Sequence, residues 1–287
     1  MHKAIAELLE FTGGIICRRQ YPELLTRLEA AVRRGELIAV LPGVYVVPEL
    51  ASDWRTIVRA VPLWNDDAVV IGDAGAALTY WSELTPRTVE IACPRRARFQ
   101  TKGITVCERV IPPELVTRIA GVPIAVPALN AIDLIPRHGG DVIDRALRSR
   151  MATLADMYRA LDHTPGRRGN GDRRRMLLDS RGEPWSEAER LSHRILRGAG
   201  MTRWHANVPI VCNGHKYFQD ILMDDCPVVL EIDGMVHLRR EMFETDRRRG
   251  NELLLAGRYV LHFTWLMLNQ EPDWFISTTQ GAIALAS

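Results

Sequence analysis

A mostly apolar, β-branched run near the C-terminus reads Val228-Val229-Leu230-Glu231-Ile232-Asp233-Gly234. This composition predicts a buried strand that ends at the glycine. Because strand side chains alternate between two faces, Glu231 and Asp233 project to one face and Leu230 and Ile232 to the other. Two acids on one face of such a strand indicate either a ligand site or an exposed acidic strand that binds nothing.

The preceding residues predict a hairpin partner, a strand over 217–222 followed by the turn Asp224-Asp225-Cys226-Pro227. With this turn, Met223 pairs with Val228, and Asp220 lies opposite Glu231. A slip of one residue would place Asp220 on the other face, so the register is a definite prediction.

Asp220, Glu231 and Asp233 therefore share one predicted patch. Neighbouring carboxylates repel one another, and a divalent cation removes that penalty. Hard oxygen donors of this kind suit Mg²⁺ or Mn²⁺. We expect these three acids to be the metal ligands.

Two further residues extend this candidate site. Ser186-Glu187-Ala188-Glu189 is an S-x-x-E capping box that opens a helix, and Glu189 in its first turn offers a fourth oxygen. His237, just past Gly234, is a candidate proton donor to a leaving group, although a lone histidine after a strand is also typical of an ordinary surface residue.

The C-terminal region, residues 176–287, has the predicted element order α-β-β-β-α-β-α. This order predicts an α/β domain in which helices flank one mixed sheet. The elements that follow the capped helix are strands over 207–211, 217–222 and 228–234, a helix over 241–256, a strand over 259–263 and a helix over 273–285.

Five motifs of this region resemble the very-short-patch-repair-like endonuclease domains of the PD-(D/E)XK superfamily. They are Ala188-Glu189-Arg190, Phe218-Gln219-Asp220, Val229–Gly234 with His237, Asp246-Arg247 and Tyr259–Phe263. The resemblance implies a restriction-endonuclease-like fold with Glu189, Asp220, Glu231 and Asp233 at active-site positions. It gives His237 and Asp246, with the adjoining Arg247, accessory roles. Asp233 occupies the position of the superfamily's usual lysine.

Residues 163–175 combine glycine, proline and arginine without apolar periodicity, which predicts a linker. Before it, residues 49–162 read as an α/β domain, with a strand and a small-residue helix around Gly72. This middle segment contains no motif with catalytic spacing.

Residues 1–48 read as helix, turn, helix and hairpin, an order typical of a winged helix. Pro22 opens the second long helix, Gly35 ends it, and Pro42-Gly43 forms the hairpin turn. A helix that enters the major groove of DNA needs cationic side chains on or beside it. Three arginines have this position here, Arg27, Arg33 and Arg34, so we expect them to contact DNA.

The first 160 residues resemble AbiEi-type antitoxins, which carry an N-terminal winged helix followed by an α/β domain. The resemblance rests on Gly13-Gly14-Ile15-Ile16, Arg33-Arg34-Gly35, Pro42-Gly43-Val44-Tyr45 and Pro127–Leu134. It implies a DNA-binding role and a possible cognate toxin as partner.

Composition limits the other possibilities. The apolar fraction of 47% argues against a disordered chain, and no apolar run approaches the roughly 20 residues of a membrane span. The five cysteines are odd in number and form no CxxC motif, so reduced thiols are expected. These features predict a cytoplasmic protein that has no membrane partner.

The sequence thus predicts a multi-domain α/β protein that acts as a Mg²⁺-dependent endonuclease on double-stranded DNA. An RNA-directed nuclease fits the same acids. The alternative from another class is a non-catalytic DNA-binding regulator or antitoxin, with the C-terminal domain as a binding module.

Overall fold

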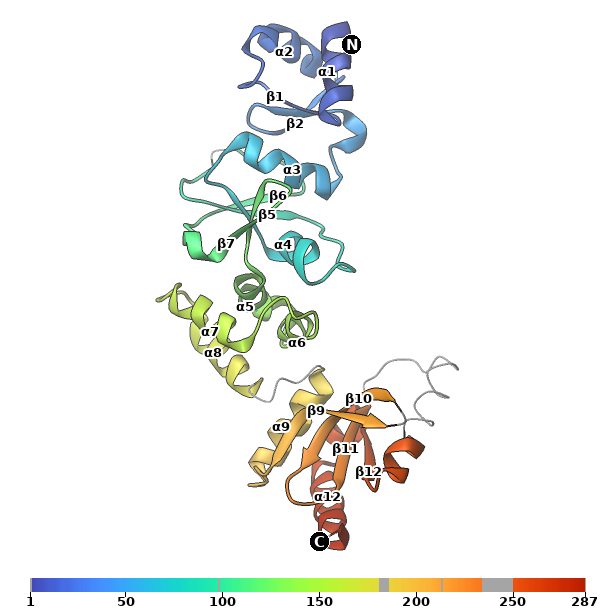
Figure 1. Cartoon of the computed structure of the whole chain (residues 1–287). Coiled ribbons are helices and arrows are strands. Elements are labelled where there is room, and N and C mark those ends of the chain that lie inside the picture. The colour runs from blue at the N-terminus through green and yellow to red at the C-terminus, as the bar shows by residue number, and fades with distance from the viewer. Residues whose placement is uncertain (1, 98, 181–185, 213, 234–249, 287) are drawn as a thin grey trace. The chain divides into compact units, whose positions relative to one another are not determined.

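The computed structural model describes residues 2–97, 99–180, 186–212, 214–233 and 250–286. The protein is of the mixed α/β class, and its described residues form sheets of three, five and four strands (Figure 1). None of the helices in these ranges is long and apolar enough to cross a membrane. The five cysteines are free thiols.

The chain divides into two compact units, and the backbone passes from one to the other three times. One unit comprises Met1–Arg137 and Met151–Arg167, and the other comprises His138–Arg150 and Arg168–Ser287. A short helix from the middle of the chain therefore belongs with the C-terminal sheet.

The N-terminal segment has a three-stranded antiparallel sheet of order β1-β3-β2. Its elements in chain order are α1 (Lys3–Thr12), β1 (Ile15–Cys17), the 3-10 helix η1 (Pro22–Leu24), α2 (Leu25–Arg33), β2 (Ile38–Leu41) and β3 (Val44–Val46). The predicted helices and hairpin are present. The strand Ile15–Cys17 was missed, since three residues are too few to show a period, and the predicted second helix opens as a 3-10 turn at Pro22.

The rest of the first unit surrounds a five-stranded sheet of order β6-β5-β4-β8-β7. Its elements are η2 (Pro48–Leu50), α3 (Trp54–Trp64), β4 (Val69–Ile71), α4 (Gly72–Thr79), β5 (Val89–Cys93), β6 (Ile104–Glu108), η3 (Pro113–Leu115), β7 (Val116–Ile119), β8 (Val122–Ala125), α5 (Pro127–His138) and α7 (Leu154–Asp162). Helix α3 packs Ile57 and Val61 into one core that holds Val44 of the first sheet and Val70 of the second. The two N-terminal segments thus share a core.

The second unit contains the four-stranded sheet, of order β12-β11-β10-β9 (Figure 1). Its elements are α6 (Asp141–Arg148), α8 (Asn170–Asp179), α9 (Glu187–Gly198), β9 (Trp204–Cys212), β10 (His215–Met223), β11 (Val228–Asp233), β12 (Tyr259–Thr264), α11 (Trp265–Gln270) and α12 (Pro272–Ala286). Strands β9, β10 and β11 are antiparallel and β12 is parallel to β11, so the sheet is mixed, as predicted. The described end of the predicted helix 241–256 is helical at 250–255.

One face of this sheet is covered by α9 and α12. Leu196 of α9 and Phe275 of α12 share a buried core with Ile221, Leu230 and Ile232. The predicted inward face of β11 is therefore confirmed.

Helix α8 occupies half of the segment that the sequence assigned to a linker. Gly169 precedes it with a φ of 83°, in the left-handed region that glycine tolerates. The buried Arg173 donates hydrogen bonds to the Arg168 carbonyl (2.8 Å) and the Asn170 side chain (3.1 Å). The helix shows little apolar periodicity because an arginine occupies a buried position of its first turns.

Candidate functional site

The predicted register of the acidic hairpin is present in the structure. Ile221 pairs with Leu230, and Leu222 with Val229. The same register places Asp220 opposite Glu231 on the face that points away from the core of α9 and α12. The predicted register is therefore confirmed for the paired residues, and its continuation brings Asp220 and Glu231 to the same face.

Strands β10 and β11 separate at this acidic pair. Their paired residues end at Ile221 and Leu230, and the next contact is made by a side chain. The backbone amide of Ile232 donates a hydrogen bond to Oδ2 of Asp220 at 2.7 Å. The carboxylate thereby replaces a backbone acceptor that β10 no longer offers, which fixes the orientation of the Asp220 side chain.

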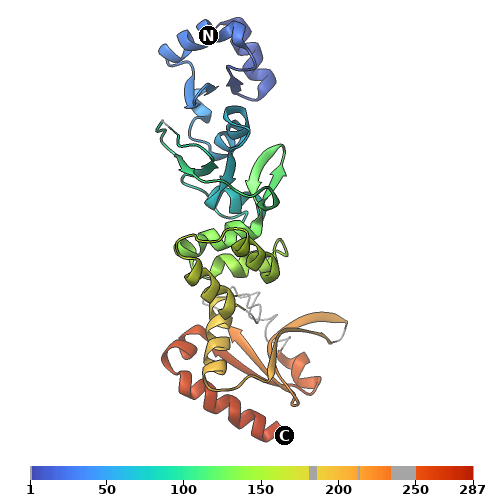
Figure 2. The same cartoon turned by 90° about the vertical axis from the view of Figure 1, so that its left-hand side faces the viewer.

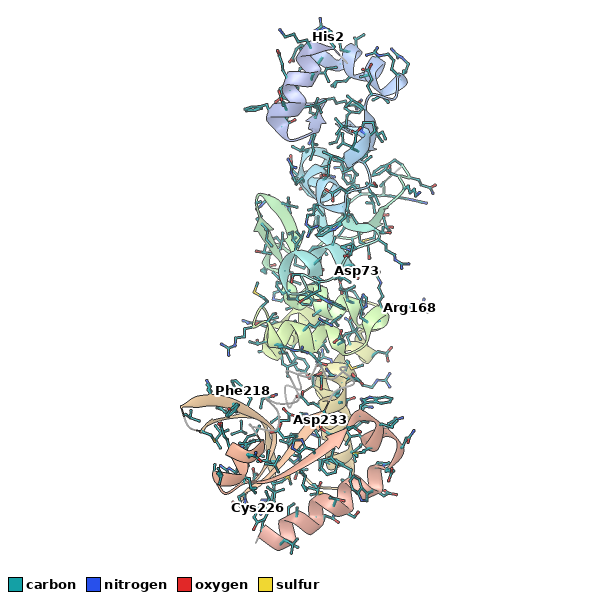
Figure 3. All side chains as sticks on the ribbon, turned by 90° about the vertical axis from the view of Figure 1, so that its right-hand side faces the viewer. His2, Asp73, Arg168, Phe218, Cys226 and Asp233 are labelled. Atoms are coloured by element: carbon teal, nitrogen blue, oxygen red, sulfur yellow. The ribbon has the colours of Figure 1, made fainter. Side chains whose placement is uncertain are left out.

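Burial distinguishes the acids of β11. Glu231 is only 5% exposed, whereas the side chain of Asp233, at the end of the strand, is 56% exposed. A buried carboxylate is costly unless a cation or hydrogen bonds compensate it. Glu231 is thus the buried acid of this strand, while Asp233 lies at the strand end (Figure 3).

His262 of β12 is a residue of this face that the sequence did not identify. In the parallel pairing of β11 and β12, His262 is the partner of Glu231 and Thr264 is the partner of Asp233. Nδ1 of His262 lies 3.7 Å from Oδ2 of Asp233. The strand itself was predicted, but its register depends on the crossover that joins parallel strands, so the sequence held no signal for this contact.

Glu189 is buried in the first turn of α9. Ser186 caps this helix, since its Oγ accepts from the Glu189 amide (3.1 Å) and donates to Oε1 of the Glu189 carboxylate (3.0 Å). The predicted N-cap is confirmed. Helix α9 packs on the Leu230 face of the sheet, opposite the face of Asp220.

A buried contact between Arg190 and Asp144 fastens the helix that carries Glu189. The guanidinium of Arg190 bonds to the Asp144 carboxylate of α6, to the Ser180 hydroxyl and, at 3.1 Å, to the Gly140 carbonyl. A Cβ on Gly140 would lie 2.4 Å from Nε of Arg190, so glycine is needed there. Breaking such a pair by removing one partner is strongly destabilising.

The donor chemistry of Asp220 and Glu231 fits a hard divalent cation. Mg²⁺ is commonly held by one or two carboxylates while it keeps several of its waters. Across the residues that the structure describes, no three histidine, cysteine or acidic side chains are arranged to hold a metal ion. Glu189, Asp220, Glu231 and Asp233 therefore do not form a single ligand cluster among these residues. His237, Asp246 and Arg247 lie outside the described ranges.

The predicted DNA contacts of the N-terminal segment differ in their availability. Arg27 and Arg33 are exposed on α2, whereas Arg34 binds Glu36 through two hydrogen bonds of 2.9 and 3.0 Å. That guanidinium lowers the pKa of Glu36 to about 2. Because Glu36 neutralises Arg34, Arg27 and Arg33 are better placed to contact a phosphate.

Neither a protein-family model nor a curated protein sequence matches this chain.

Proposed function

We propose that the protein is a Mg²⁺-dependent endonuclease that hydrolyses phosphodiester bonds in double-stranded DNA. The observation that supports this proposal is the register of β10 and β11, which places Asp220 and Glu231 on one face just beyond the last paired residues, with Asp220 oriented by the Ile232 amide. The two carboxylates lie at the point where the neighbouring strands separate, and Glu231 is buried there. A divalent cation beside two such acids would favour their ionised forms.

Each residue has a defined task in this proposal. Asp220 and Glu231 hold the cation, and the Ile232 amide keeps Asp220 in position for it. When bound, the cation supplies Lewis-acid polarisation of the phosphodiester and activation of the attacking water. The attacking water would lose one proton to solvent as its oxygen forms a bond to phosphorus and the bond to the leaving oxygen breaks. The leaving oxygen takes up a proton, for which His237 is the proposed donor.

The finer architecture belongs to the same proposal. We assign a restriction-endonuclease-like fold to residues 176–287, on the basis of the α9-β9-β10-β11 order followed by parallel β12. We assign a winged helix to residues 1–48, on the basis of the β1-β3-β2 sheet order and the helix α2 that bears Arg27 and Arg33. This segment would deliver the nuclease to duplex DNA.

A second function is favoured by two observations. Asp233 is directed to solvent beside His262, and the described acids do not form a three-ligand cluster. A non-catalytic DNA-binding regulator, or an antitoxin with a cognate toxin, would have such a splayed acidic strand.

The two functions are separated by a nuclease assay on the full-length protein. Supercoiled plasmid, linear duplex DNA and duplex RNA are each incubated with the protein in Mg²⁺, Mn²⁺ or EDTA. The endonuclease should nick DNA in Mg²⁺ or Mn²⁺ and should be inactive in EDTA. Inactivity with every metal and substrate, together with tight DNA binding, would favour the regulator.

A further inference from the structure

Strands β9 and β10 extend beyond the four-stranded sheet as a two-stranded ribbon. They pair from Met223 and Trp204 to His215 and Cys212, whereas β11 pairs with β10 only at its end near the turn. We call residues 208–212 and 214–219 the β9–β10 ribbon. It projects past the other strands of the second unit (Figure 2).

One face of the β9–β10 ribbon continues into the acidic pair. Strand alternation places Lys216, Phe218 and Asp220 on the same side of β10. Lys216 Nζ lies 5.2 Å from the centroid of the Phe218 ring, as expected for neighbours on one face. Four residues at about 3.3 Å per residue separate Lys216 from Asp220 by about 13 Å.

The cross-strand partners on this face are accessible. Lys216 pairs with Val211 and Phe218 with Pro209, and Val211 is 68% exposed. Lys216 and Pro209 are also exposed. The ribbon thus presents an open surface with a cation near its tip, and Figure 3 shows Phe218 on this hairpin.

The charge and the backbone of the ribbon favour an anionic partner and oppose the addition of a further β-strand at the sheet edge. The sequence contains no aspartate or glutamate between Met201 and Gln219. Pro209 removes a backbone donor from β9, which is the edge strand of the sheet, and proline on an edge opposes the addition of a further strand.

We propose that the β9–β10 ribbon enters the major groove of B-form duplex DNA, where Lys216 contacts a phosphate. This inference rests on the proposed function and specifies its substrate class. The B-DNA major groove is about 12 Å wide and admits a two-stranded ribbon, whereas the A-form RNA major groove is too narrow for side chains to read. The ribbon then holds the duplex against the face of Asp220 and Glu231.

The lysine content of the chain permits a direct test. Lysine occurs only at Lys3, Lys102 and Lys216, in α1, before β6 and on the ribbon. The full-length protein is acylated with an amine-reactive reagent in EDTA, with and without a duplex DNA oligonucleotide, and each lysine is quantified by mass spectrometry. DNA should protect Lys216 and leave Lys102 reactive, since Lys102 lies outside the ribbon and outside residues 1–48. A protein that binds the DNA while Lys216 reacts as fast as in the free protein would overturn the proposal, as would a lack of DNA binding at low salt.

A variant supplies the second measurement. Lys216→Gln should reduce the slope of log K against log salt by about 0.9, the contribution of one phosphate contact, while Lys102→Gln should leave it unchanged. Both variants should keep the wild-type thermal midpoint, because both side chains are exposed. An unchanged slope for Lys216→Gln, or equal protection of Lys216 by duplex RNA, would contradict the proposal.

Different results would contradict the proposed DNA contact of the ribbon and the proposed nuclease activity. Plasmid cleavage without protection of Lys216 would contradict DNA binding by the ribbon, and the proposed nuclease activity would still hold. Protection of Lys216 without plasmid cleavage in the presence of any divalent metal would support DNA binding by the ribbon. It would count against the proposed nuclease activity.

Discussion

The backbone amide of Ile232 on β11 donates a hydrogen bond to the Asp220 carboxylate on β10, with nitrogen and Oδ2 2.7 Å apart. This bond lies where the two strands cease to pair. Asp220 therefore has a structural role in addition to its proposed role as a metal ligand. Substitutions that remove one of these roles and keep the other can separate them.

Asp220→Ala removes the acceptor of the Ile232 amide, and Asp220→Asn keeps an oxygen in that position. A partly buried donor left without its partner costs about 1–3 kcal/mol. We expect Asp220→Ala to lower the free energy of unfolding by this amount and Asp220→Asn to change it little. Chemical denaturation of the two variants gives the comparison, and equal stability of the two would show that the amide bond is not required.

Arg33 and Arg34 should contribute unequally to DNA binding. Arg34 is held by Glu36, and Arg33 is exposed on α2. Arg33→Ala should reduce the slope of log K against log salt by about 0.9, whereas Arg34→Ala should reduce it by less. The slopes are measured by fluorescence polarisation of a labelled duplex. A larger effect of Arg34→Ala would mean that DNA displaces Glu36.

Trypsin should cut the chain after Arg168 and leave the products associated. Arg168 is exposed, while Nη1 of Arg167 lies 2.6 Å from Oδ1 of Asp133. Residues 138–150 pack with the C-terminal fragment, partly through the buried bond of Asp144 to Arg190. The nicked protein should elute as one species in gel filtration. Separation of the fragments would mean that this packing is weak.

Asp144 should make stability depend on pH. Burial raises the pKa of Asp144 to about 7, against the opposing charge of Arg190. Because the unfolded pKa is about 3.9, the folded protein retains this proton between about pH 4 and 7. The contribution of Asp144 to the free energy of unfolding is therefore complete below about pH 4 and is lost as the pH rises to about 7. The free energy of unfolding falls over this range by at most about 1.4 kcal/mol per pH unit.

The control for this pH dependence is Asp144→Asn, which cannot titrate. The free energy of unfolding of wild type relative to this variant should fall from about pH 4 to 7 and stay level above. Urea denaturation across this range gives the difference. A difference that increases with pH would show that Arg190 outweighs burial and that the carboxylate is ionised in the folded state.

The acidic hairpin was accessible to sequence reasoning because its geometry is local. A four-residue turn and the alternation of side chains were enough to place Asp220 opposite Glu231. The S-x-x-E pattern likewise located the start of α9, because Ser186 and Glu189 are one turn apart.

Relationships over longer distances in the sequence were not accessible. His262 reaches Asp233 through the register of two parallel strands, and neither strand encodes that register. Arg190 finds Asp144 across 46 positions, and this pair assigns α6 to the C-terminal unit. Helix α8 was missed because the buried Arg173 counts as polar in any apolar pattern.

The most direct test of the proposed endonuclease is plasmid cleavage by matched acid-to-amide variants. Asp220→Asn and Glu231→Gln keep the shape of the side chains and remove the charges that hold the cation. Asp225→Asn, on the turn of the same hairpin, is the control, since its backbone φ of 61° suits asparagine. We expect wild type and Asp225→Asn to nick the plasmid in Mg²⁺ and not in EDTA, and Asp220→Asn and Glu231→Gln to be folded and inactive. Cleavage by Asp220→Asn at the wild-type rate would contradict the proposal.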